Sequence, residues 1–212
     1  MVKGLIFDMD NTLLRSRIDF EAMKQDVYQF LVSHGILAEG IELSRHTAST
    51  LIEAGVKTNR MNESLIKELW DVPKKHEVTG MKDAELEPGV KELLKEWQGQ
   101  YHLVVVTNNS IEAAEAALRD HDVLRFFEQV VGREQVRLLK PAPDAFLHVL
   151  QRFGEVSPGE WISVGDSWMD GRASALAGIP FIAYGGDEAK MKEMEVFPRA
   201  FIRDLRNLNA YL

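Results

Sequence analysis

The chain of 212 residues is long enough for one large domain or for a domain that carries an inserted module. Its formal net charge of −8, from 25 basic and 33 acidic residues, argues against general binding to nucleic acid or to an anionic membrane surface. Cysteine is absent, which excludes disulfides and thiolate chemistry. No apolar run is long enough to span a bilayer, and the N-terminus lacks the pattern of a signal peptide. We therefore expect a soluble, cytoplasmic protein, either a monomer or a homodimer.

The first predicted strand, at residues 4–7, is an apolar run that leads directly into two carboxylates, Asp8 and Asp10. Side chains alternate along an extended chain, so both carboxylates would face the same side. Carboxylates at the end of a buried strand repel each other and lose hydration. A divalent cation would offset that cost, and hard oxygen ligands suit Mg²⁺. The alternative is an ordinary polar turn after a core strand, since Asn11 and Thr12 also form a turn signal.

The segment from residue 15 to residue 86 shows helical periodicity and no core strand. We predict that it is an all-helical insertion, which divides the core domain into residues 1–14 and 87–212. Three helices are expected in it. The first begins at Asp19 and ends at Gly35, and the others cover residues 43–54 and 62–70.

Strands and helices alternate again after the insertion. Four more apolar strands are predicted, at residues 103–106, 129–132, 161–164 and 181–184. Repeated strand–helix units with buried apolar strands predict an α/β fold, with a doubly wound, Rossmann-like parallel sheet covered by helices on both faces. In sheets of this kind ligands bind beyond the carboxyl ends of the strands.

Polar residues of suitable types follow these strands. Thr107 and Asn108 come directly after the second strand, at a helix N-terminus that favours anions, and Asp166 and Asp170 follow the fourth. Prolines after Lys140 restrict the loop from which this lysine would neutralise a phosphate and a carboxylate. The alternatives are a plain helix cap at Asn109 or Ser110, an N-cap at Asp166 with Asp170 in the first turn, and a solvated surface lysine.

The four motifs, taken in order, resemble those of the haloacid dehalogenase superfamily, whose members are mostly phosphate-ester hydrolases. The resemblance covers essentially the whole chain, and the insertion at 15–86 resembles the helical cap of the phosphoglycolate phosphatase and β-phosphoglucomutase branch. The matched residues are Asp8 and Asp10 in the first motif, Thr107 in the second, Lys140 in the third, and Asp166 with Asp170 in the fourth.

The resemblance implies a magnesium-dependent phosphatase that acts on a small phosphorylated metabolite. Asp8 would attack phosphorus and form an aspartyl phosphate, and Asp10 would protonate the leaving group and then activate water. Mg²⁺ would be held by the Asp8 carboxylate, the Asp10 carbonyl and Asp166, while Asp170 would orient Asp166 or a metal-bound water.

The resemblance also implies how substrate is held. Thr107, the Asn108 amide and Lys140 would bind the phosphoryl oxygens. The helical cap would supply specificity, and two cations between its second and third helices, Lys57 and Arg60, are candidates for contacting an anionic or hydroxylated leaving group. The alternative is that both are ordinary solvated charges.

Some residues depart from the family pattern. Asn11 stands where glycine is usual, Arg15 where an acidic residue is common in related phosphatases, and Trp168 is bulky for the fourth motif. Thr12 favours a phosphatase over a phosphosugar mutase, which usually carries valine at this position. A dehalogenase would lack Asp10. The alternative that is not an enzyme is a catalytically idle binding or regulatory domain on the same fold, and a lost Asp8 or Asp10 would have favoured it.

Overall fold

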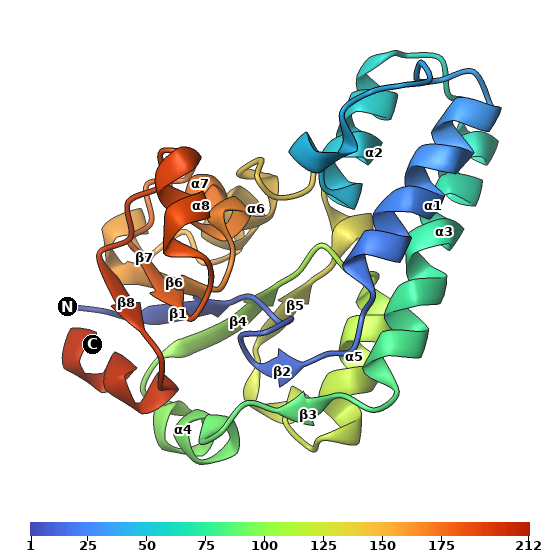
Figure 1. The fold of residues 1–212 in the computed structure, drawn as a ribbon. Helices are drawn as coiled ribbons and strands as arrows, with labels where there is room; N and C mark the ends of the chain where they lie inside the picture. The colour runs from blue at the N-terminus through green and yellow to red at the C-terminus, as the bar shows by residue number, and fades with distance from the viewer. The chain divides into compact units, whose positions relative to one another are not determined.

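The computed structural model describes residues 1–212, and the chain divides into two units: Met1–Ser16 with Ala84–Leu212, and Arg17–Asp83 (Figure 1). The first unit holds the α/β sheet and the second is helical. No helix in either unit combines the length and the apolar character that crossing a membrane would require.

All six strands of the large sheet are parallel, in the order β5-β4-β1-β6-β7-β8. β1 lies between β4 and β6, with Phe7 opposite both Val105 and Val164. The carboxyl ends of these three strands therefore meet at one edge, and the predicted α/β class is confirmed. The strands are β1 (Gly4–Phe7), β4 (His102–Val106), β5 (Gln129–Val131), β6 (Trp161–Gly165), β7 (Phe181–Tyr184) and β8 (Ala200–Ile202).

Helices cover both faces of the sheet. Neighbouring residues of β1 point to opposite faces, so they pack against different helices. Ile6 belongs to an apolar cluster with residues of α6 (Asp144–Arg152) and α7 (Trp168–Leu176). Phe7 stacks instead on Trp97 of α4 (Val90–Trp97), with ring centroids 6.0 Å apart. The other helices of this unit are α5 (Ile111–Asp120), α8 (Glu188–Glu193) and the 3₁₀ segments η2 (Leu124–Phe126), η3 (Arg133–Gln135), η4 (Pro158–Glu160) and η5 (Leu205–Tyr211).

The helical unit consists of α1 (Phe20–Ser33), η1 (Leu43–Arg45), α2 (Ala48–Lys57) and α3 (Glu63–Met81). Its apolar core includes Val27 and Leu31 of α1, Leu51 of α2 and Leu69 of α3. Gly80 allows α3 to approach the chain before α1, since a Cβ at this position would lie 2.5 Å from the Ile18 Cα.

The predicted number of helices in this unit is correct, and the first lies where it was predicted, with Asp19 as its N-cap, but the predicted limits of the second and third are wrong. The second begins at Ala48 rather than 43, because the Thr47 and Thr50 side chains form a capping box at that point. The third continues past 70 to Met81, through Pro73, and the buried positions of its second half are Pro73, Glu77, Gly80 and Met81.

A two-stranded ribbon was missed by the sequence prediction. β2 (Leu14–Arg15) pairs antiparallel with β3 (Glu85–Leu86), so the predicted limits of the insertion, 15 and 86, lie inside a short sheet of the first unit. Arg15 donates two hydrogen bonds to the buried Glu87 carboxylate, which also accepts from the Tyr184 hydroxyl. The unusual Arg15 thus has a partner that attaches the ribbon to the end of β7.

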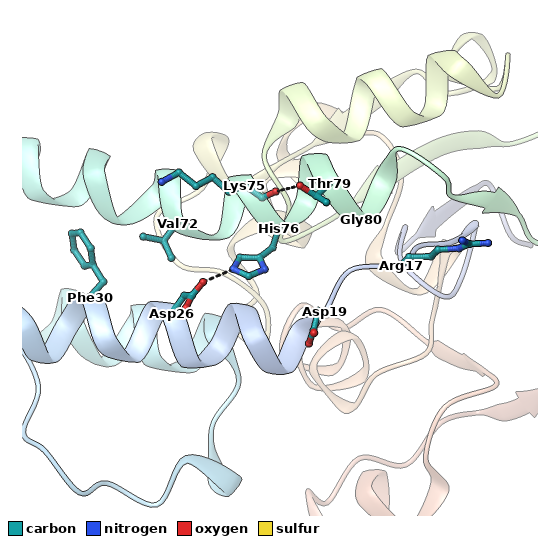
Figure 2. Close-up of a pocket in the computed structure, with 9 residues that line it drawn as sticks. All are labelled: Arg17, Asp19, Asp26, Phe30, Val72, Lys75, His76, Thr79 and Gly80. Atoms are coloured by element: carbon teal, nitrogen blue, oxygen red, sulfur yellow. Dashed lines mark hydrogen bonds and ion pairs between the residues drawn. The ribbon is translucent and has the colours of Figure 1, made fainter.

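A cavity of about 480 Å³ lies in the helical unit, between α1 with the chain just before it and the C-terminal half of α3 (Figure 2). The His76 ring crosses it to contact the Asp26 carboxylate, 2.8 Å away. Its lining contains none of the predicted site residues.

Candidate functional site

Lys140 and Asp8 form the centre of a charged cluster at the carboxyl edge of the sheet. Asp8 directly follows β1, and its backbone N–H donates to the Val164 carbonyl of β6 at 2.9 Å. The Lys140 ammonium donates to Asp8 Oδ1 and Asp170 Oδ1, both at 2.6 Å, and to the Val106 carbonyl at 3.0 Å. The predicted lysine is therefore no solvated surface group, since its side chain is 4% exposed.

The cluster contains three carboxyl groups and one ammonium group. Carboxylate oxygens of Asp8, Asp166 and Asp170 lie within 4.8 Å of one another, against the single ammonium of Lys140. Burial raises the pKa of Asp8 well above its usual range, although Lys140 opposes the rise. Burial, together with the charge of Asp170, raises the pKa of Asp166 to about 7. Burial opposes the charge of Lys140 too, but Asp170 and Asp8 outweigh it and keep the pKa of the ammonium above its ordinary value.

Asp10 lies apart from this group of oxygens. Its Oδ2 accepts a hydrogen bond from the Asn109 side-chain amide at 2.6 Å. Asn109 is 5% exposed and had been predicted only as one of two helix-cap candidates; the cap of α5 is Ser110, which accepts from the Ala113 N–H. Sequence reasoning therefore missed Asn109 as a site residue. The one signal for it was that Ser110 can cap α5, so the neighbouring Asn109 side chain is not needed as a cap.

Thr107 and Asn108 continue β4 into the same edge. The Thr107 N–H donates to the Val131 carbonyl at 3.0 Å, and its buried hydroxyl accepts from the Asn109 N–H at 3.2 Å. The Asn108 side chain reaches the Lys140 backbone instead of solvent. Both predicted residues thus lie in the loop that contacts Asp10 and Lys140.

The fourth motif begins α7. Its N-cap is Ser167, whose hydroxyl accepts from the Met169 N–H, so the alternative that Asp166 caps this helix is wrong. Asp170 Oδ2 accepts from the Ser167 N–H at 3.1 Å while its Oδ1 accepts from Lys140. Asp166 is hydrogen-bonded by the Asn11 side chain, whose backbone has φ +55°. This is a left-handed conformation that glycine adopts freely and asparagine tolerates.

Trp168 begins α7 and packs against the guanidinium of Arg172, which lies 5.1 Å from its ring. None of the predicted site residues forms a hydrogen bond or ring contact with the Trp168 side chain. The bulky side chain therefore contributes packing at the start of this helix.

The two predicted cap cations lie in the helical unit. Lys57 ends α2 and pairs with Glu53 at 2.6 Å. Arg60 is in the following loop, where its Nη1 donates to the Gly35 carbonyl at 3.3 Å. That bond uses one of the five guanidinium donors.

The chain is similar to known proteins along most of its length. Residues 5–184 match the model of the haloacid dehalogenase-like hydrolase family. The chain is 30% identical to a phosphoglycolate phosphatase of Pseudomonas syringae pv. tomato, over 97% of this chain and 78% of that protein. It is 29% identical to the fructose-1-phosphate phosphatase YqaB of Escherichia coli, over 83% and 93% respectively. A crystal structure of a HAD-superfamily hydrolase from Geobacter sulfurreducens shares the fold, with a TM-score of 0.63, 24% identity and full coverage of both chains.

Proposed function

We propose that this chain, a phosphatase that belongs to the haloacid dehalogenase-like hydrolase family, hydrolyses a small phosphorylated metabolite through an aspartyl phosphate on Asp8 and depends on Mg²⁺. The observation that carries the proposal is the buried Lys140 ammonium held 2.6 Å from both Asp8 and Asp170. A fixed cation next to a carboxylate, at the edge where such sheets bind ligands, suits a phosphoryl group in transfer.

Asp8 acts as the nucleophile. A bond forms from one of its carboxylate oxygens to phosphorus while the bond from phosphorus to the leaving-group oxygen breaks. The carboxylate must be ionised to attack, and burial works against this by raising its pKa. The Lys140 ammonium favours the ionised form and also lies where the charge of the transferred group arrives.

Asp10 moves the protons. It gives a proton to the departing oxygen and then takes one from the water that attacks the aspartyl phosphate. The hydrogen bond from Asn109 supports this role because it fixes the orientation of the Asp10 carboxylate. The Thr107 hydroxyl and the Asn108 N–H would bind the phosphoryl oxygens from the adjacent loop.

The acidic cluster fits Mg²⁺. Its donors are all carboxylate oxygens, the ligand type that Mg²⁺ prefers, and those of Asp8, Asp166 and Asp170 lie within 4.8 Å of one another. Asp8 and Asp166, with the Asp10 carbonyl, would hold the ion. Asp170 would orient them, since both its oxygens already accept hydrogen bonds. When bound, the ion would neutralise charge on the phosphoryl group.

The helical unit would recognise the leaving group. Relatives are named for phosphoglycolate and for fructose 1-phosphate, which are both small and polar. Arg60 is the stronger of the two proposed contacts, because most of its donors are not used by Gly35, whereas Lys57 already has a carboxylate partner. A guanidinium also matches a carboxylate with two parallel hydrogen bonds.

The test is hydrolysis of p-nitrophenyl phosphate by the purified protein. We expect turnover with Mg²⁺, loss of turnover on chelation and recovery when the ion is restored. Asp8→Asn should lower kcat by roughly 10⁴-fold or more, as expected for a nucleophile. Asp122→Asn is a matched control, since Asp122 is an exposed ion-pair residue and asparagine tolerates its left-handed backbone.

Activity retained by a folded Asp8→Asn protein would rule out the nucleophile, and full activity after exhaustive chelation would rule out the metal. A panel of phosphorylated metabolites, compared by kcat/KM, would then identify the substrate.

A further inference from the structure

The Asn108 side chain holds both backbone groups of one residue. Its Nδ2 donates to the Lys140 carbonyl at 3.0 Å, and its Oδ1 accepts from the Lys140 N–H at 2.9 Å. Both distances are typical of well-formed hydrogen bonds. The two residues are 32 positions apart in the chain, so this double contact connects two separate loops.

Lys140 has little other support for its backbone. It lies between η3 and α6, in a segment with no helix or strand, so no sheet ladder fixes its position. Its ammonium must nevertheless reach three acceptors, on Asp8, Asp170 and Val106. A lysine side chain is long and flexible, so the place of its ammonium depends on where its backbone is held.

Asn108 provides that support from a rigid part of the molecule. It follows Val106 and Thr107 at the end of β4, and β4 pairs with β1, the strand that leads into Asp8. The backbone of Lys140 is therefore fixed relative to the same sheet that fixes Asp8. A shift of about 1 Å in a group near the reacting atoms can lower a rate by roughly 100-fold. The position of the Lys140 backbone relative to Asp8 should therefore have a large effect on the rate.

We propose that the Asn108 side chain is a positioning residue: by holding the backbone of Lys140, it keeps the lysine ammonium on Asp8 and Asp170. This role is additional to any use of the Asn108 N–H in binding phosphate. Its effect on turnover rests on the proposed phosphatase function, whereas its effect on the place of the ammonium does not.

The chain offers a matched control in Gln135. Its side chain also accepts a hydrogen bond from a loop backbone, the Gly132 N–H at 2.8 Å, and has no contact with the charged cluster. Asn108→Ala and Gln135→Ala therefore both remove contacts between an amide side chain and a loop. Only the first removes them from Lys140.

The decisive experiment measures the chemical accessibility of Lys140 without using activity. Each protein is acetylated briefly with acetic anhydride, and the modification of every lysine is quantified by peptide mass spectrometry. Because an amine must lose its proton to react, Lys140, buried and paired, should react more slowly than the exposed Lys57 and Lys91 in the unmutated protein. In Asn108→Ala the rate at Lys140 should rise by at least threefold, and in Gln135→Ala it should not change.

Kinetics provide the second arm. Asn108→Ala should lower kcat on p-nitrophenyl phosphate by roughly 10- to 100-fold, and Gln135→Ala by less than about twofold. An unchanged Lys140 acetylation rate in a folded Asn108→Ala protein would overturn the inference, as would an equal rise in Gln135→Ala. If acetylation responds as expected and no variant, including the unmutated protein, hydrolyses phosphate esters, the positioning role stands and the proposed function fails.

Discussion

The two units of this molecule use the same charged residue types in opposite ways. At the carboxyl edge of the sheet, the side chains of Lys140 and Asp170 are each 4% exposed, and the ammonium contacts two carboxylates. In the helical unit, Lys57 is 66% exposed and pairs with a residue one turn away on its own helix. Surface pairs of the second kind contribute little to stability, whereas a buried charge is costly unless it is paired. The surroundings of a lysine, rather than its identity, decide whether it carries chemistry.

The largest expected difference comes from removing one lysine of each kind. Lys140→Met leaves Asp8 and Asp170 buried without their cation, so the free energy of unfolding should fall by roughly 3 kcal/mol or more. Lys57→Met should change it by less than about 0.5 kcal/mol. Urea unfolding at neutral pH in metal-free buffer measures both. Equal losses in the two variants would remove the contrast between the units.

The pH dependence of stability should identify the cost of burying Asp166. Its pKa is about 7 in the folded chain, raised by burial and by Asp170, and near the ordinary value of 3.8 when unfolded. The folded state therefore binds more protons between about pH 4 and pH 7, and the contribution of this group to stability falls as pH rises through that range.

In metal-free buffer, Asp166→Asn should thus be more stable than the unmutated protein at pH 8, by an amount that shrinks towards pH 4. Adding Mg²⁺ should reverse the order, because the ion stabilises the folded protein that binds it. Urea titrations at several pH values give both results. A stability difference between the two proteins that does not vary with pH would show that folding does not change the pKa of Asp166.

A smaller effect is expected from Arg60, the exposed cation proposed to bind substrate. Arg60→Ala should raise KM for the physiological substrate about tenfold and leave KM for p-nitrophenyl phosphate nearly unchanged. Arg45→Ala is the control, since Arg45 is another exposed arginine of the same unit, 77% exposed and paired with Glu42. An equal effect on both substrates, or none on either, would make Arg60 an ordinary surface charge.

The smallest effect concerns a buried polar group that the charged cluster does not use. The Thr12 side chain is fully buried and its hydroxyl has no hydrogen-bond partner. Thr12→Val should therefore raise the free energy of unfolding by about 1 kcal/mol. Thr79→Val in the helical unit should not, because that hydroxyl donates to the Lys75 carbonyl. Thermal unfolding of both variants makes the comparison, and destabilisation by Thr12→Val would show that the hydroxyl has an unrecognised partner.

The edge of the sheet could be predicted because strand ends are visible in a sequence. The apolar runs before Asp8 and Thr107 are continuous, the one before Asp166 is interrupted only by Ser163, and parallel pairing brings their ends together whatever the connections contain. Contacts between loops could not be predicted in the same way. Whether Asn109 caps a helix or holds Asp10 depends on a residue 99 positions away, and periodicity carries no information on that contact.

The missed elements share a physical cause, which is their length. β2 and β3 contain two residues each, too few for any alternation of apolar and polar positions to be recognised, and β8 contains three, of which only Ile202 is buried. β8 depends on the strand beside it, since Phe201 pairs with Ala183 of β7 and is itself 41% exposed. Tertiary pairing, rather than local preference, makes these segments extended.

The ribbon of β2 and β3 makes the helical unit removable. Arg15 and Glu85 are paired across it, so the chain leaves for the helical unit and returns from it at neighbouring points. A short turn could join the two strands directly, and closing such a turn costs little entropy. Because the six parallel strands lie outside this unit, recombination could exchange one helical insert for another in a single step. The anchor of Arg15 and Tyr184 on Glu87 would remain, so new leaving-group specificities could evolve without disturbing the residues proposed to act on phosphorus.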